Sequence, residues 1–421
     1  MTPHPKLIIG QVVQEHAEEV AYLYSLRPIL TTAPHITLDD LFGFDDRIAA
    51  HLDGLSIAGE NGWHYCAAPL DSPSRGQVFT AAVWAIESKQ RTKLDRVFAL
   101  VEALPEGAAA LISAFGWVSA RLLKGTAKEL LDNMALFRKI VGLAAFLIHR
   151  VDPGESLNIV ITCQDTPLRV RALRGAGELG RRDLLPKCIE YLKDQDHVCA
   201  FWAAWSSVLL GDRSRAVESL RKLSVLSAPR QERALRLVLK ALSIQEGHVV
   251  LKTLAQNPSN QRELIRGTGI VGDPFYIPWL IKQLGDAKTA RLAGEAFSFI
   301  TGLDLAYLDL DQKPPENFES GPNDNPNDDN VAMDEDDDLS WPDPAKIRAW
   351  WSANSYRFQA DTRYFMGEPV SRAHCVKVLK EGYQRQRIAA AEYLCLLNPG
   401  TPLFNTSAPA WRQKRLLEKM E

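Results

Sequence analysis

Apolar and polar positions in the middle of the chain repeat at steps of about 30 residues. Each copy is an apolar stretch with helical spacing that ends at two or three residues, which we call the anchor of that copy. The anchors are Leu179-Gly180, Leu210-Gly211, Ala241-Leu242, Val271-Gly272 and Ile300 to Gly302. Two copies align with every position moved by 31, one opening at Asp165 and the next at Asp196. A unit of this length holds two short amphipathic helices, which cannot bury their apolar faces alone. The pattern therefore predicts helical pairs stacked into a solenoid, an architecture that binds along a concave surface more often than it catalyses.

The same pattern divides the rest of the chain. We predict an N-terminal helical cap over 1–75, a repeat domain of about seven or eight helical pairs over 76–313, and a C-terminal helical region over 342–421. In the cap, apolar spacing indicates a helix over 11–30, and Thr37 with Asp40 forms a capping pair for a second helix. Asp343 followed by Pro344 is the start signal of the C-terminal region. The expected fold is all-α, a right-handed α-solenoid with a cap and a helical extension.

Charge is segregated, although the formal net charge is only -3. Between Lys313 and Lys346 there are 11 acidic and no basic residues, whereas residues 345–421 carry 13 basic and 6 acidic side chains. The acidic run over 314–341 is nearly free of apolar residues and cannot offset its ordering entropy, so we expect it to be disordered or draped, and a solvated linker is the favoured interpretation. The alternative hypothesis is an acidic segment that competes for a basic site.

Composition sets the compartment that we expect. At 421 residues and 46% hydrophobic content the chain can bury a large core. The apolar run near the N-terminus is too short for a signal sequence, and no apolar stretch is long enough to span a bilayer. The sequence thus favours a soluble cytoplasmic protein with reduced thiols. Its cysteines form no C-x-x-C pair, and we interpret them as small buried residues: Cys66, Cys163, Cys188, Cys199, Cys375 and Cys395.

Catalytic signatures are missing from the sequence. It contains no phosphate-binding glycine loop, no H-E-x-x-H and no G-x-S-x-G. His16, His35, His51 and His64 gather in the N-terminal region, but their spacings of 19, 16 and 13 fit no zinc module. We therefore expect no catalytic residue, no cofactor and no metal.

Basic residues suggest two further sites. Arg169, Arg171 and Arg174 could form a stripe for a polyanion, but an arginine that links neighbouring repeat loops is the favoured interpretation. The basic runs over 384–387 and 411–415 invite a nucleic-acid hypothesis. A pI near 6.3, the lack of interleaved aromatic residues and the acidic run as an internal partner argue against it.

Contact candidates come from the expected solenoid geometry. Trp202 and Trp205 lie three apart on one helix face and are predicted to fill the core between stacked pairs rather than to form an exposed contact. One of the adjacent Trp350 and Trp351 is expected at an interdomain seam. Second helices line the concave surface in solenoids of this kind, which selects six candidates for partner binding: Lys187, Tyr191, Lys222, Trp279, Lys282 and Gln283.

The repeat consensus, Asp-x-Pro-x-x-Arg-x-x-Ala-x-x-x-x-Gly-x-Leu-Gly, is similar to the short HEAT-like repeats of bilin lyases. Over nearly its full length the chain resembles a family of bacterial HEAT-like proteins of unassigned biochemical activity. The segments that carry this resemblance are residues 51–60, 149–154, 201–206, 291–304 and 384–387. The resemblance implies HEAT-like helical pairs and an accessory role in type VI secretion, either immunity to a secreted toxin or holding an effector before export. It offers no catalytic residue, and the Asn/Asp-rich insert at 323–338 departs from it.

These observations predict a protein-binding scaffold. The expected partner is a secreted toxin effector or a secretion spike component, with no membrane contact. One alternative is a HEAT-like lyase-type enzyme acting on a tetrapyrrole, which needs a polar pocket that contains acids. Another is a helical-repeat protein that binds nucleic acid, which needs a strongly basic concave face.

Overall fold

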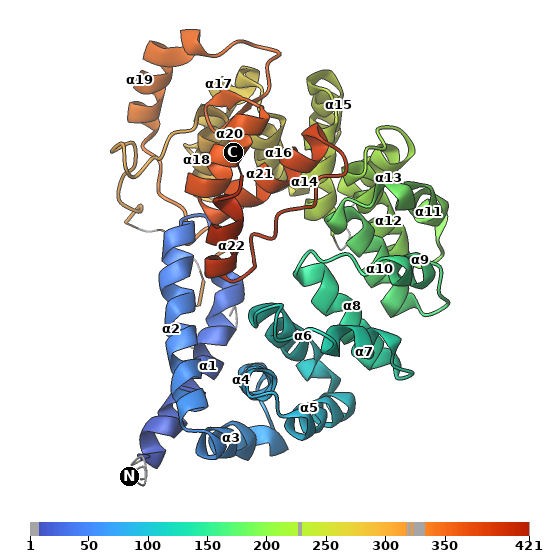
Figure 1. Ribbon diagram of the computed structural model, residues 1–421. Helices are drawn as coiled ribbons and strands as arrows, with labels where there is room; N and C mark the ends of the chain where they lie inside the picture. The colour runs from blue at the N-terminus through green and yellow to red at the C-terminus, as the bar shows by residue number, and fades with distance from the viewer. Residues whose placement is uncertain (1–7, 226–229, 317, 319–320, 323–332, 421) are drawn as a thin grey trace.

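The computed structural model describes residues 8–225, 230–316, 318, 321–322 and 333–420. Within these ranges the chain forms 22 α-helices, seven short 3₁₀ helices and one hairpin of two two-residue strands. The helices pack in sequential pairs, which confirms the all-α prediction and is consistent with a helical repeat (Figure 1). No single helix in the described ranges is long and apolar enough to cross a membrane; the bent pair Arg91–Ala103 and Pro105–Trp117 has the length and composition only when taken together.

The N-terminal region consists of α1 (Gly10–Leu30), α2 (Leu38–Ile57) and α3 (Glu60–Ala67). The predicted capping pair is present, because Thr37 Oγ1 accepts from the Asp40 amide at 3.2 Å and Asp40 accepts from the Thr37 amide at 2.9 Å. α1 packs against α2, α3 and α4, so its buried face (Val13, Ala17, Val20 and Leu23) joins the core of the first repeat helices.

Seven pairs and a single helix follow within the described residues, in agreement with the predicted seven or eight. The first members of the pairs, and α18 after them, pack on one another in order, as α10 does on α8 and α12, and α16 on α14 and α18. The helices are α4 (Arg75–Glu87), α5 (Arg91–Ala103), α6 (Ala108–Trp117), α7 (Thr126–Asp132), α8 (Leu136–Ile148), α9 (Glu155–Val160), α10 (Thr166–Leu179), α11 (Leu185–Glu190), α12 (His197–Leu209), α13 (Arg215–Ser224), α14 (Gln231–Ala241), α15 (Ile244–Leu254), α16 (Gln261–Val271), α17 (Ile277–Gln283) and α18 (Ala290–Thr301).

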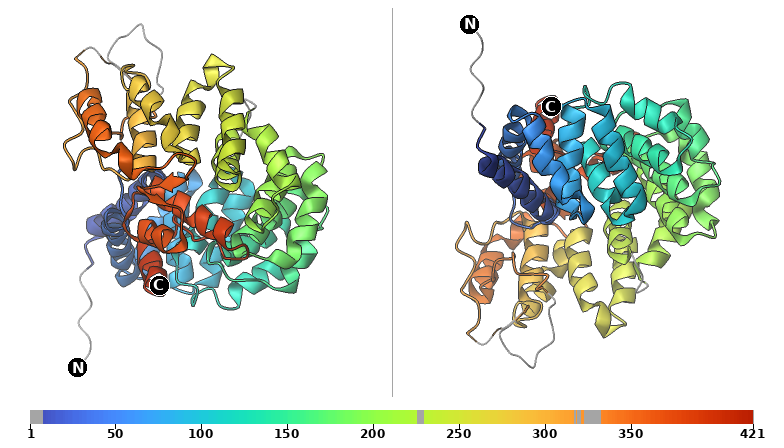
Figure 2. Two further views of the ribbon diagram at one scale, coloured as in Figure 1. Left: turned by 90° about the horizontal axis from the view of Figure 1, so that it is seen from above. Right: turned by 90° about the horizontal axis from the view of Figure 1, so that it is seen from below.

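The repeat helices follow a curve. Figure 1 shows the even-numbered helices from α6 to α16 on its inner side, and α9, α11, α13 and α15 on its outer side. The C-terminal segment lies inside the curve in Figure 1 and in the left view of Figure 2. The expectation that second helices line the concave surface is therefore wrong, because the first helix of each pair faces inward.

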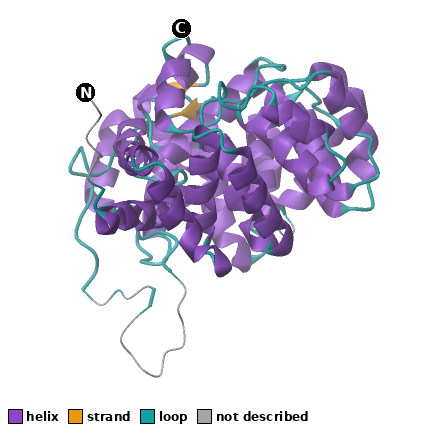
Figure 3. Ribbon diagram, turned by 60° about the horizontal axis from the view of Figure 1, so that its bottom comes forward, coloured by secondary structure: helices purple, strands orange, loops and turns teal. Residues whose placement is uncertain are grey.

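The C-terminal region contains α19 (Pro344–Asn354), β1 (Tyr364–Phe365), β2 (Glu368–Pro369), α20 (Arg372–Glu381), α21 (Gln384–Leu397) and α22 (Ala410–Leu417). Asp343 is the N-cap of α19, as predicted. The two strands, drawn in orange in Figure 3, pair Tyr364 with Pro369 and Phe365 with Glu368. α22 packs on α2, so the end of the chain contacts its beginning.

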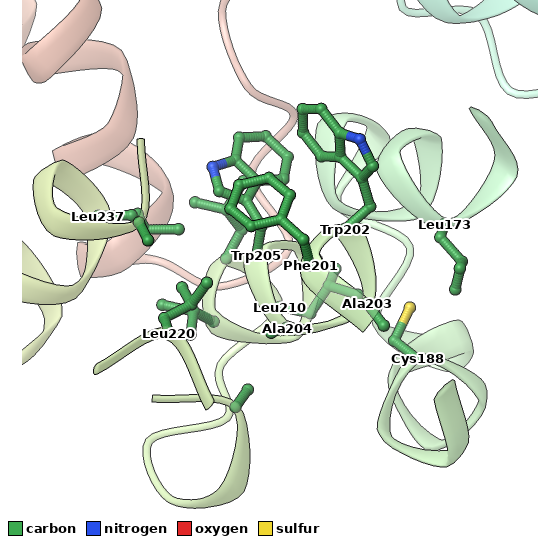
Figure 4. Close-up of a cluster of buried hydrophobic side chains, with 14 of the residues drawn as sticks. Leu173, Cys188, Phe201, Trp202, Ala203, Ala204, Trp205, Leu210, Leu220 and Leu237 are labelled. Carbon is green, nitrogen blue, oxygen red and sulfur yellow. The ribbon is translucent and has the colours of Figure 1, made fainter. Parts of the chain in front are cut away.

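Aromatic side chains fill the core between successive pairs. Trp202 and Trp205 are 6% and 4% exposed, which confirms the prediction that they pack inside (Figure 4). Trp350 lies 6.0 Å from the Phe297 ring of α18, so it is the tryptophan at the seam between the C-terminal region and the repeats. All six cysteines are free; five are buried and Cys163 is half-buried, close to the predicted state.

Candidate functional site

The C-terminal segment runs along the inner rim of the repeats, in their order over residues 364–367 and in the opposite direction over residues 399–412. The Tyr364 amide donates to the Gly272 carbonyl at 2.8 Å, and the Gly367 amide donates to Ile300 O at 3.1 Å. Farther along the chain, the Leu403 amide donates to Glu178 O at 2.9 Å. Four anchor glycines that end inner helices have a positive φ, and the segment passes directly over them: Gly180, Gly211, Gly272 and Gly302. The repeat anchors are therefore docking points for the returning chain as well as helix ends.

Arginines strengthen this contact, because carbonyls at a helix C-terminus lack partners within the helix. Arg363 donates to the carbonyls of Lys240, Leu242 and Val271 at 2.5, 2.7 and 3.2 Å. Arg412 donates to Trp117 O and Val118 O at 3.2 and 3.0 Å. Two of the four arginines in the basic runs considered for nucleic acid, Arg387 and Arg412, are buried and bonded inside the protein.

The partner candidates lie on outer helices of three different units. Lys187 on α11 and Lys222 on α13 are exposed and pair with the neighbouring Glu190 and Glu218. Tyr191 is half-buried beneath the Arg169 guanidinium, 5.4 Å from its ring centroid. The structure thus does not gather the six candidates into one site.

The three candidates on α17 lie close together. Trp279 is half-buried, Lys282 is exposed, and Gln283 accepts a hydrogen bond from Gln261 at 3.3 Å. Phe275 lies in the 3₁₀ turn Pro274–Tyr276 just before α17 and is 67% exposed, with its ring centroid 6.0 Å from that of His248 on α15. Sequence reasoning missed Phe275.

A cavity of about 500 Å³ lies between α14, α16, α18 and α21. Its walls combine apolar side chains with four cationic and four anionic groups: Arg236, Lys240, Arg266, Arg385, Glu232, Glu263, Glu295 and Glu335. Sequence reasoning missed this site, because the charges come from separate helices with no common spacing.

Ion pairs hold the charged groups of this cavity. Buried Lys240 on α14 pairs with Glu392 on α21 at 2.9 Å, and Arg236 lies 3.6 Å from the same carboxylate. Burial lowers the pKa of Lys240, and the Lys240 and Arg236 charges lower the pKa of Glu392 against its desolvation. Burial raises the pKa of Glu295, although Arg385 donates to it at 2.9 and 3.0 Å. The network thus ties α21 to the inner repeat helices.

The acidic run ends on an arginine cluster beside this cavity, formed by Arg262, Arg266 and Arg291. Most of the expected linker from 317 to 332 lies outside the described residues. Asp336 is 3% exposed and receives two bonds from Arg262, at 2.8 and 2.9 Å. Residues 333–341 therefore differ from the solvated linker that we expected, and the competing hypothesis of an acidic segment on a basic site describes them better.

Other sequence candidates have structural roles. Arg169 donates to Cys163 O at 2.9 Å and lies 3.4 Å from Asp194, so it links neighbouring loops, while Asp165 caps α10. His16 and His51 approach within 2.9 Å through their Nδ1 atoms. Within the described ranges no three His, Cys, Asp or Glu side chains are grouped to hold a metal ion.

Comparisons with known proteins add no relative: no family model, no curated protein and no solved structure matches this chain.

Proposed function

We propose that this protein is a partner-binding helical-repeat scaffold, built as a right-handed solenoid of HEAT-like pairs. The observation that supports it most is the surface of α17 and the 3₁₀ turn before it, where Phe275 and Lys282 are exposed and Trp279 is half-buried. Aromatic rings next to a cation are typical of the residues that dominate protein interfaces. The C-terminal segment covers much of the inner rim, so the outer layer offers the free surface.

The partner that we propose is a secreted toxin effector or a component of the secretion spike. The scaffold would act in the cytoplasm, either as an immunity protein or as an adaptor that holds the effector before export. The sequence resemblance to type VI accessory proteins supports this choice of partner. The exposed lysines Lys187, Lys222 and Lys282 favour a partner surface with negative charge.

The test is copurification of tagged protein from its native host, with mass spectrometry and gel filtration of the recovered complex. Phe275→Asp and Lys282→Glu should weaken the complex at least 10-fold, and the reversals Lys187→Glu and Lys222→Glu should have smaller effects. Lys128→Glu is the matched control, since Lys128 is equally exposed but lies on α7. Unchanged binding by folded Phe275 and Lys282 variants would exclude this surface.

A second candidate function is supported by the cavity between α14 and α21. A lyase-type activity on a tetrapyrrole needs acids and bases in one pocket, and the tertiary structure brings Glu295, Lys240 and Arg385 to its walls. Propionate groups of an open-chain tetrapyrrole would pair with the cations. Absorbance titration with a bilin tests it: a spectral shift that Arg385→Ala removes supports the activity, and an unchanged spectrum excludes it.

A further inference from the structure

The clearest ligand-like contact in the molecule is made by the chain itself. The cluster Arg262, Arg266 and Arg291 comes from adjacent inner helices, α16 and α18, which pack on each other. Arg262 and Arg266 are one helical turn apart, so their charges repel unless an anion lies between them. The anions are supplied by Asp334 to Asp336, the first three of five consecutive acidic residues.

Each acidic residue uses a different part of the cluster. Asp334 pairs with Arg291 at 2.5 Å, and Asp336 takes the two-bond pair with Arg262. Glu335 is shared by Arg262 and Arg266 at 3.1 and 3.3 Å. Bidentate pairing of arginine with a carboxylate is both strong and geometrically selective, so the cluster recognises an acidic turn rather than a diffuse negative charge.

Two aromatic rings, which flank the acidic residues in the sequence, contact the most buried arginine of the cluster. The Arg291 guanidinium lies 4.6 Å from the Trp341 ring centroid and 5.2 Å from that of Phe318. Its side chain is 5% exposed, and its Nε has no hydrogen-bond partner within the described residues. A donor thus remains that the acidic segment does not use.

The cluster is also open on one side. Arg266 and Glu335 form part of the wall of the 500 Å³ cavity, whose further cations include Arg236 and Arg385. Glu335 is 69% exposed, so the middle of the acidic segment is accessible from solvent. An acidic chain longer than Asp334 to Asp336 could therefore extend from the cluster into the cavity.

We propose that the cluster Arg262, Arg266 and Arg291 is a binding site for an acidic segment of a partner protein, and that residues 334–336 occupy it in the free protein. This inference rests on the proposed partner-binding function and names the chemistry of the partner. The partner presents at least three acidic residues in a turn, and it displaces a segment of the same chemistry. Binding is slowed and weakened by this internal competitor, whose effective concentration is in the millimolar range, typical of a short tether.

The experiment uses the full chain and a fluorescent peptide with the sequence of residues 333–341. The variant Asp334→Asn/Glu335→Gln/Asp336→Asn keeps the shape of the internal segment and removes the charge of the three residues that contact the arginines. We expect it to bind the peptide at least 10-fold more tightly than the natural chain does, and increasing salt should weaken binding. A peptide with Asn and Gln in place of the acidic residues is the control ligand.

Two further variants keep the outcome decisive. Adding Arg262→Ala to the triple variant should abolish binding, whereas adding Arg174→Ala, which removes a partly exposed arginine of α10, should not. Glu335→Gln alone should increase the affinity for the peptide by less than the triple variant does. A folded triple variant that binds no peptide overturns the proposal, and so does one that loses its helical circular dichroism, since the segment would then be part of the fold. Neither result depends on the copurification experiment or on α17.

Discussion

Replacing Gly272 with alanine should detach the returning C-terminal segment from the repeats. Gly272 has φ +72 and ψ 16, the left-handed conformation, which costs alanine about 1–2 kcal/mol. An added methyl group would also overlap the carbonyl oxygen of Tyr364. Relieving that overlap separates the chains and breaks the bond from the Tyr364 amide to Gly272 O, which contributes about 1 kcal/mol. The substitution should therefore destabilise the docked segment by about 2–3 kcal/mol, and by more if Arg363 also loses its hydrogen bonds to the helix-end carbonyls.

The assay is amide hydrogen exchange over residues 360–370 together with urea unfolding. Gly272→Ala should accelerate amide exchange over residues 360–370 and lower the urea concentration at the midpoint of unfolding. Gly154→Ala also places alanine at positive φ, but nothing lies within 4 Å of its added methyl group, so exchange at 360–370 should not change. Gly43→Ala, inside α2 and unobstructed, should stabilise by about 1 kcal/mol. The docking argument is refuted if Gly272→Ala leaves exchange at 360–370 as it is in the natural chain.

Three other predictions follow from buried charge and chain connectivity. Lys240→Met removes the only amine bonded to buried Glu392 among the described residues, leaves Arg236 and Arg233 as the nearby cations, and should lower the free energy of unfolding in urea by about 3 kcal/mol. Lys240→Met/Glu392→Met should recover most of this loss, and an equal loss in both variants would contradict the prediction. Burial lowers the pKa of His149 to about 4, so on acidification the unfolded chain binds the proton before the folded chain does. The free energy of unfolding should therefore fall by at most about 3 kcal/mol as the pH drops from about 6.5 to 4. His149→Gln should reduce this pH dependence, measured by urea unfolding at several pH values. Limited proteolysis should cut first within 314–332, because this stretch is polar and acidic. The two fragments should coelute in gel filtration, since residues 363–412 bond to the ends of the inner helices. Fragments that separate would exclude this docking.

The sequence by itself determined the local elements. The helix expected over 11–30 is α1, Gly10–Leu30; Thr37 and Asp343 cap α2 and α19 as predicted, and the anchor glycines Gly180, Gly272 and Gly302 end α10, α16 and α18. These features act over a few residues, so they leave a period or a short motif in the chain. Trp202 and Trp205 were likewise predicted as core, because their spacing of three faces a stacked neighbour.

Tertiary structure alone decided which surface is free. The C-terminal segment contacts the inner rim through backbone carbonyls and arginines such as Arg363 and Arg412, about 90 to 300 residues away from their partners in sequence. Backbone groups are present at every position, so such contacts leave no pattern in the sequence. The same holds for the cluster Arg262, Arg266 and Arg291, which becomes one site only when α16 packs on α18. The inward position of the first helices likewise depends on how successive pairs pack on one another, so the repeat period alone did not reveal which helix of each pair faces the C-terminal segment.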